Sequence, residues 1–64
     1  MVNTYIAHGD RCGQTGFVPY EDAHNPTQYP QFAEEWLTPE SAMTAAKDIG
    51  YTNVMVFLIA VKGD

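Results

Sequence analysis

The longest apolar run in the chain is VMVFLIAV, at residues 54–61. It is rich in β-branched and aromatic residues and contains no polar residue, which is typical of a buried β-strand. Since side chains alternate along a strand, both faces of this strand are apolar. A single helix covers only one of these faces, so the pattern predicts that something further covers the other.

A helix is predicted just before this strand, over residues 39–49. Thr38 suits the N-cap, the proline that follows it suits the first helical position, and Gly50 supplies the left-handed conformation that commonly ends a helix. Glu40 near the start and Lys47 near the end complement the helix dipole. An apolar stripe of mostly small side chains should let the helix pack closely against a sheet. It consists of Ala42, Ala45, Ala46 and Ile49, with Met43 on its flank.

The N-terminal part of the chain has shorter apolar segments. Residues 2–8 are expected to form a first strand beside the C-terminal one, with its end marked by Gly9 and Asp10. The glycines that follow indicate a flexible connection. Residues 17–20 are expected to form a short second strand, which Pro19 would confine to the edge of the sheet.

The middle of the chain is rich in turn residues. Two residue pairs ending in proline mark residues 21–30 as an ordered loop. Residues 31–37 fit a helix, because Phe32 and Trp36 stand four apart, and they also fit the two-residue alternation of a strand. We favour a strand that leads into the helix.

Together these elements predict one α+β domain that spans residues 1–64. We expect a small antiparallel or mixed sheet of three to four strands with the helix 39–49 packed on one face, in the order β-β-(β)-α-β. A domain of this size buries only about 60% of its surface, and disulfides, a metal or a partner subunit usually stabilise such chains. Cys12 is the single cysteine, so an intramolecular disulfide is excluded.

The chain is acidic, with eight acidic and three basic residues and a net charge of −5. The basic residues are scattered, which disfavours direct nucleic-acid binding because phosphate contacts need a positive patch. We therefore expect a protein partner with a basic surface, such as a nucleic-acid-binding site on another protein; acidity that serves solubility alone is the alternative. No stretch reaches the roughly 20 apolar residues of a membrane-spanning helix, and the first residues lack the pattern of a secretory signal. These features predict a cytoplasmic protein with no membrane partner.

Four residues have side chains suited to a transition metal: His8, Asp10, Cys12 and His24. Structural zinc sites usually have paired ligands, as in C-x-x-C, and no such pair is present. Cys12 with a histidine as its base is the one candidate nucleophile, yet a chain this small seldom encloses a substrate pocket. We therefore predict no catalytic residue, no metal ligand and no cofactor, and a protein that is not an enzyme. A small metal- or thiol-dependent domain using Cys12 is kept as an alternative.

Aromatic and acidic residues gather in the same middle region of the sequence. Aromatic anchors edged by charge are typical of protein-binding hot spots. The predicted partner-binding residues are Glu21, Asp22, Tyr29, Phe32, Glu34, Glu35 and Trp36. The alternative is that Phe32 and Trp36 cover the second face of the C-terminal strand.

The segment TPESAMTAAKDIG at residues 38–50, followed by the strand at 54–61, completes an order of strand, strand, helix and strand in a short acidic chain. In this respect the chain is similar to small bacteriophage proteins made early in infection, some of which inhibit host RNA polymerase or other host machinery. The resemblance implies an inhibitor of a host protein, acting in a host–virus interaction in the host cytoplasm.

Two main functional hypotheses follow from the residues. In the first, the chain is a non-catalytic protein that binds and inhibits or modulates another protein by occupying a basic surface. In the second, it is a homodimeric structural or accessory protein whose C-terminal strands or second sheet faces pack together.

Overall fold

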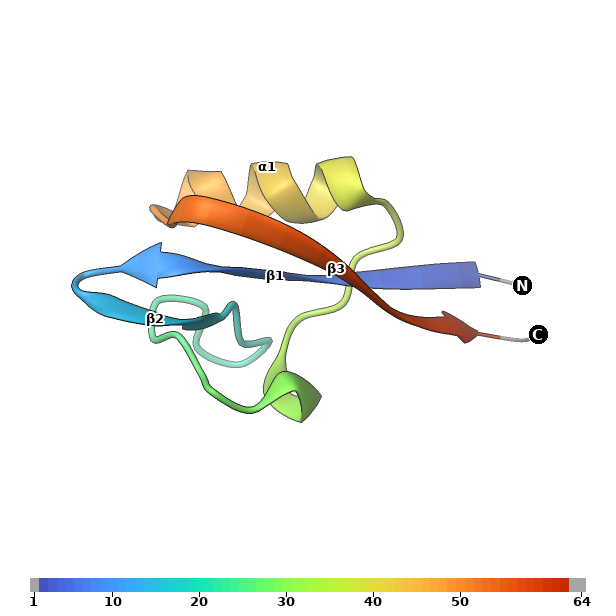
Figure 1. Cartoon of the computed structure of the whole chain (residues 1–64), viewed down its shortest axis with the longest axis horizontal. Helices are drawn as coiled ribbons and strands as arrows, with labels where there is room; N and C mark the ends of the chain where they lie inside the picture. Colours follow the sequence, from blue (N-terminus) through green and yellow to red (C-terminus); the bar gives the residue numbers. More distant parts are fainter. Residues whose placement is uncertain (1, 63–64) are drawn as a thin grey trace.

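The structure of the chain, a computed structural model, describes residues 2–62. Its elements are β1 (Val2–Arg11), β2 (Gln14–Phe17), the 3-10 helix η1 (Pro30–Phe32), α1 (Pro39–Ile49) and β3 (Thr52–Lys62) (Figure 1). Within residues 2–62 the strands form one three-stranded antiparallel sheet in the order β2-β1-β3. The predicted α+β class, with one helix on one face of the sheet, is confirmed.

The helix α1 forms as the sequence predicts. The Thr38 side chain accepts a hydrogen bond from the Ser41 backbone N–H (3.1 Å), which satisfies one of the free donors of the first turn. Gly50 ends the helix in the left-handed region, with φ of 113°. The buried face is built on Ala42 and Ala46, both fully buried. Because these side chains are small, the helix lies close to the sheet.

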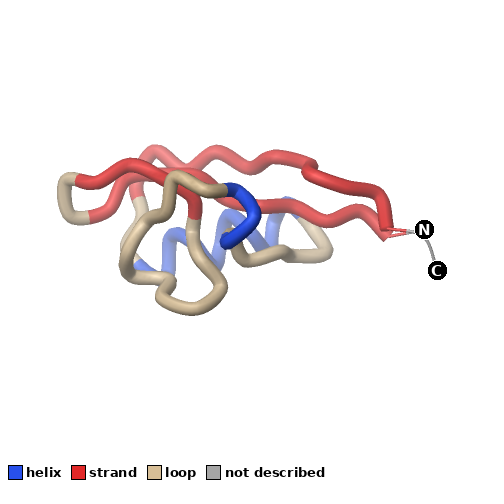
Figure 2. The backbone as a smooth tube through the Cα atoms, turned by 90° about the horizontal axis from the view of Figure 1, so that it is seen from below, coloured by secondary structure: helices blue, strands red, loops and turns tan. Residues whose placement is uncertain are grey.

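The core lies between α1 and one face of the sheet. Its buried members are Ala7, Val18, Ala42, Ala46 and Tyr51. Tyr5, Trp36, Val54 and Val56 pack around them and are partly buried. In Figure 2 the helix runs along one side of the strands.

The first strand is longer than predicted. β1 continues to Arg11, and β2 begins at Gln14, so residues 9–16 are a β-hairpin and the expected flexible connection is wrong. Cys12 (φ 52°) and Gly13 (φ 79°) are both left-handed, as a tight two-residue hairpin turn requires. A short strand exists, but at Gln14–Phe17 instead of residues 17–20, because the turn falls earlier in the sequence.

Residues 18–36 leave the sheet and return to its edge. No regular strand or α-helix forms over residues 21–29, in agreement with the predicted loop. The strand favoured for residues 31–37 is wrong. The first residues of this segment belong to η1. After η1, Ala33 makes an isolated bridge to Pro19, and Trp36 makes one to Tyr5. Each bridge pairs a single residue, because the segment crosses the edge of the sheet without running along it.

The strand β3 occupies an edge of the sheet, and the expectation that it is buried is wrong for the isolated chain. Met55, Phe57 and Leu58 are 57%, 40% and 55% exposed. An 11-residue helix is about 16 Å long and an 11-residue strand about 36 Å, so α1 is too short to cover the whole length of β3. Figure 1 shows β1 and β3 continuing past the helix toward the two chain ends.

The side of the sheet away from α1 carries an aromatic cluster of His8, Phe17 and Phe57. The ring of His8 meets Phe17 edge to face at 4.9 Å and Phe57 at 6.3 Å between centroids. Ile6 pairs with Phe57 in the strand register and is buried, whereas Met55 and Phe57 stay half exposed. This face is therefore only partly covered by the chain itself.

Candidate functional site

A hollow of about 210 Å³ lies in the segment that returns to the sheet edge. Exposed aromatic rings and acidic side chains surround it. Its lining residues are Pro19, Tyr20, Glu21, Asp22, Asn25, Thr27 and Phe32. We call the exposed part formed by Tyr20, Glu21, Asp22, Tyr29 and Phe32 the loop surface.

The loop is shaped by local hydrogen bonds around Asp22. Its carboxylate accepts from the His24 backbone N–H (3.3 Å) and from the Asn25 side-chain amide, and its carbonyl accepts from the Asn25 N–H at 3.0 Å. Aspartate commonly stabilises turns in this way. Asp22 is thus both a wall of the hollow and a structural residue of the turn, whereas the Glu21 side chain is exposed.

Two side chains from the sheet region tie this loop to the core. The Tyr51 hydroxyl donates to the Ala23 carbonyl at 2.7 Å, and one Arg11 Nη donates to the His24 carbonyl at 2.9 Å. Arg11 also donates from Nε to the Ile49 carbonyl at the end of α1 (3.2 Å). Burial raises the pKa of Tyr51 above its ordinary value, with the nearby Asp22 adding to the rise and Arg11 opposing it. The first half of the loop is therefore anchored by the buried Tyr51 and the half-buried Arg11.

The aromatic rim is built on the second half of the loop. Tyr29 and Phe32 meet edge to face, with centroids 5.9 Å apart and an angle of 84° between their planes. The Phe32 N–H donates to the Tyr29 carbonyl (3.1 Å), and the Tyr20 N–H donates to the Phe32 carbonyl (3.0 Å). Tyr20 and Phe32 line the same hollow and Tyr29 contacts Phe32, so three exposed rings lie near one another.

The structure brings four of the predicted partner-binding residues together. Glu21, Asp22 and Phe32 line the hollow, and Tyr29 contacts it through the ring of Phe32. The other three predicted residues, Glu34, Glu35 and Trp36, lie between this surface and α1 in the sequence. Glu34 is half buried, with its N–H bonded to the Val18 carbonyl at 2.8 Å, and Glu35 is exposed.

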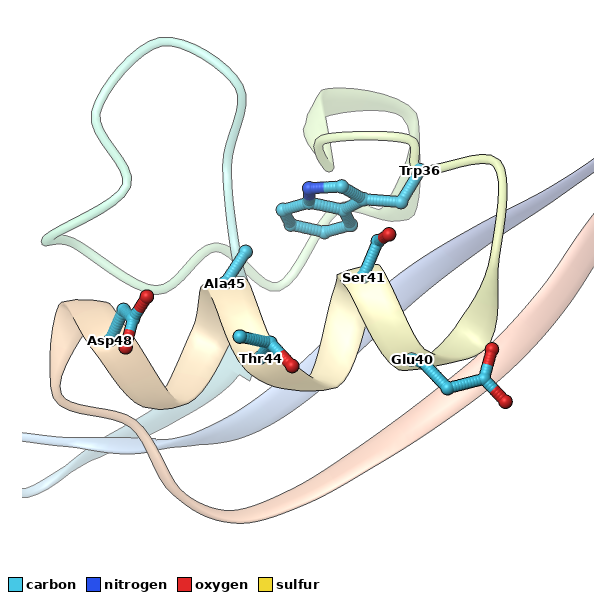
Figure 3. A pocket seen from close by; sticks show the side chains of 6 residues that line it. All are labelled: Trp36, Glu40, Ser41, Thr44, Ala45 and Asp48. Carbon is cyan, nitrogen blue, oxygen red and sulfur yellow. The ribbon is translucent and has the colours of Figure 1, made fainter.

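Trp36 lies apart from the loop surface. Its backbone pairs with Tyr5 in both directions, at 2.8 and 2.9 Å, and its side chain packs against the core on the helix side. Figure 3 shows the indole lying over α1 beside Ser41 and Ala45. There it helps to line a second hollow of about 410 Å³, whose other walls are helix side chains including Glu40 and Asp48. The alternative in which Trp36 covers the second face of β3 is wrong, because its ring is on the α1 side.

Four wall residues were missed by the sequence prediction: Pro19, Tyr20, Asn25 and Thr27. Tyr20, next to Glu21, belonged to the aromatic region but not to the predicted set. Gly16 is a further missed determinant, because a Cβ on it would lie 2.6 Å from the Thr27 carbonyl oxygen. Its missing side chain is what lets the loop backbone lie against β2, and a glycine inside a strand is the sequence signal for such close approach.

The candidate metal-binding and thiol residues are placed in different settings. His8 belongs to the aromatic cluster, Cys12 sits exposed at the hairpin turn, and His24 lies in the loop. Asp10 accepts hydrogen bonds from Thr15 (2.6 Å) and Asn53 (3.0 Å), which hold the pKa of its carboxyl below the ordinary value. Among the residues whose placement is described, no three His, Cys, Asp or Glu side chains gather as a metal site would need.

The fold and the loop surface define a class: a small acidic α+β protein with one helix on a three-stranded antiparallel sheet and an aromatic, acidic hollow at the sheet edge. A scan against protein-family models, a search of curated proteins and a search of solved structures each found no match. The resemblance to bacteriophage early proteins thus stays a prediction. Within residues 2–62, no helix combines the length and the apolar composition that crossing a membrane requires.

Proposed function

We propose that this chain is a non-catalytic protein that modulates another protein by binding a basic segment of it on the loop surface. The observation that carries the proposal is a hollow lined by two carboxylates and by the exposed rings of Tyr20 and Phe32, with the exposed ring of Tyr29 packed against Phe32. A lysine or arginine side chain fits such a site, because its apolar stem packs against rings while its charged end meets carboxylates.

The size of the hollow supports a side chain as its occupant. At about 210 Å³ it is smaller than the roughly 300–1,000 Å³ of most small-molecule sites. A single side chain of a protein partner uses that space well, and the exposed rings beside it supply the rim of an interface. Occupying the partner's basic surface would then block whatever else that surface binds.

The charge of the whole chain supports the same class of partner. A net charge of −5 attracts basic surfaces and accelerates encounter with them, an effect that salt weakens. Glu21 is the acidic wall residue best suited to contribute, since it is exposed and Asp22 is occupied with the turn.

The proposal is tested with a fluorescein-labelled peptide of alternating arginine and glycine, followed by anisotropy at low and at physiological salt. Glu21→Gln and Phe32→Ala should each weaken binding about two- to thirtyfold, as expected for loss of one cation–π or charge contact of about 0.5–2 kcal/mol. NMR shift changes on adding the peptide should centre on Tyr20, Glu21 and Phe32.

The matched control is Asp48→Asn, which removes one exposed negative charge from α1, outside the loop surface. It should leave peptide affinity within about twofold of the wild type, because surface charges at a distance are screened. If it weakens binding as much as Glu21→Gln, the attraction is a property of net charge and the assigned site is wrong. Shift changes that avoid the loop surface would reject it equally.

A further inference from the structure

The two edges of the sheet differ sharply. The edge on the β2 side is occupied by the chain itself, since Phe17 exchanges two backbone hydrogen bonds with Thr27 (2.7 and 3.0 Å) and Tyr5 exchanges two with Trp36. The edge on the β3 side is bare: beyond β1, β3 pairs with no other segment of residues 2–62. Long apolar edge strands usually carry charges, prolines or a cover that prevents pairing. Residues 52–61 contain no charge and no proline.

The register tells which backbone groups of β3 point outward. Tyr5 and Ala7 direct their backbone groups away from β3, because Tyr5 bonds to Trp36 and the Ala7 carbonyl accepts from Val18 at 3.0 Å. In an antiparallel pair the residues that point toward the partner alternate with those that do not. Ile6 and His8 therefore bond to their register partners Phe57 and Met55. The N–H and C=O groups of Val54, Val56 and Leu58 consequently face the bare edge.

We propose that β3 pairs antiparallel with β3 of a second copy of this chain, with Val56 opposite Val56 and Val54 opposite Leu58. This register places each of these three outward-facing residues opposite an outward-facing residue of the other copy. It gives six backbone hydrogen bonds, because each hydrogen-bonded pair exchanges two. The result is a closed two-fold dimer with a six-stranded sheet, and the occupied β2 edges stop further strand addition.

The side chains on both faces fit this register. Away from the helix, Met55 of one copy lies opposite Phe57 of the other, which places the half-exposed thioether against the half-exposed ring twice in the dimer. On the helix side, a hollow of about 350 Å³ lies beside Val56, lined also by Pro39, Met43 and Thr44. This hollow leaves space at the edge for the valine and leucine side chains of the second copy.

Charge is compatible with a second copy at this place. Two chains of net charge −5 repel, and residues 52–61 add no charge of their own to that repulsion. Glu40 also lines the hollow beside Val56, so the pairing brings this acidic side chain of each copy toward the other copy. Raising the salt concentration should therefore strengthen the dimer.

Sedimentation velocity from low to high micromolar concentration tests the dimer. The wild type should show a reversible monomer–dimer equilibrium. Met55→Lys and Leu58→Lys should each raise the dissociation constant about tenfold or more, because a charge would enter each half of a symmetric interface. Leu37→Lys is the matched control: Leu37 is 69% exposed and lies outside β3, so the same replacement should leave the equilibrium unchanged.

Amide hydrogen exchange tests the register independently of any substitution. The amides of Val54, Val56 and Leu58 should gain protection as concentration rises, whereas those of Met55 and Phe57, already bonded to β1, should be protected throughout. A chain that stays monomeric at every concentration overturns the proposal. Dimerisation that Leu37→Lys weakens as much as Met55→Lys, or association without the alternating protection, overturns it as well.

Discussion

Removing the hydroxyl of Tyr51 tests whether the core and the loop surface form one structural unit. Tyr51 is 3% exposed and packs over Gly9, and its hydroxyl donates to the Ala23 carbonyl at 2.7 Å. Tyr51→Phe keeps the ring and removes that bond. A net hydrogen bond contributes about 0.5–1.5 kcal/mol, and water can reach the half-buried Ala23, so we expect a loss of about 1 kcal/mol.

Thermal unfolding followed by circular dichroism measures this loss. For a domain of this size, about 1 kcal/mol lowers Tm by roughly 4–8 °C. The control is Tyr20→Phe, which removes the same atom from an exposed ring of the loop surface and should change Tm little. Because Tyr51 anchors the first half of the loop, its variant should also weaken binding of the arginine–glycine peptide.

The same variant has a signature in alkaline solution. Burial raises the pKa of Tyr51 in the folded state, while in the unfolded chain it titrates near its ordinary value of about 10. Above pH 10 the hydroxyl of Tyr51 loses its proton in the unfolded state before it does so in the folded state. The stability that Tyr51 contributes is therefore complete below pH 10 and is lost as pH rises toward the folded-state pKa. Tyr51→Phe should remove that part of the decline. If it matches Tyr20→Phe in both Tm and alkaline slope, the Tyr51 anchor has no energetic role.

Two further predictions concern the hairpin. Two side chains donate hydrogen bonds to the Asp10 carboxylate and lower its pKa. The stability that Asp10 contributes to the fold is therefore present above about pH 4 and is lost as pH falls below that value. Asp10→Asn should flatten this part of the dependence of stability on pH in an acid unfolding series. Gly16→Ala should destabilise the fold by about 1–3 kcal/mol in urea unfolding, since the added methyl meets the Thr27 carbonyl, while Gln14→Ala on the same strand should stay within about 0.5 kcal/mol. Equal effects of the two substitutions would show that the loop does not press on Gly16.

Local signals were sufficient to predict the helix. The start and end of the helix depend on residues close to it in sequence: Thr38, the proline after it, and Gly50. Each of them has the conformation that the sequence indicates. The hairpin turn was missed because Cys12 adopts a left-handed conformation without being one of the usual residues for it. Its conformation follows from the pairing of β1 with β2, which a residue-by-residue pattern does not contain.

The burial of β3 was predicted wrongly for a different reason. Apolar character on both faces indicates that a strand gains from being covered, but it does not say which molecule supplies the cover. The candidate site was predicted in part because Glu21, Asp22, Tyr29 and Phe32 are close in sequence and stay together in one loop. Trp36 lies apart from the loop surface because its backbone pairs with Tyr5, a contact between distant parts of the chain.

The proposed dimer and the proposed binding site lie at opposite edges of the sheet, so each stands without the other. In a dimer joined along β3, the order across the molecule is loop surface, β2, β1 and β3, then the same elements reversed. The two loop surfaces would face away from each other at the ends, accessible to partners together. A partner with two suitably spaced basic segments would then bind with an affinity set by effective concentration as well as by each contact. Salt acts oppositely on the two events, weakening the attraction at the loop surface while it relieves repulsion between copies. That opposition separates self-association from partner binding in a single titration.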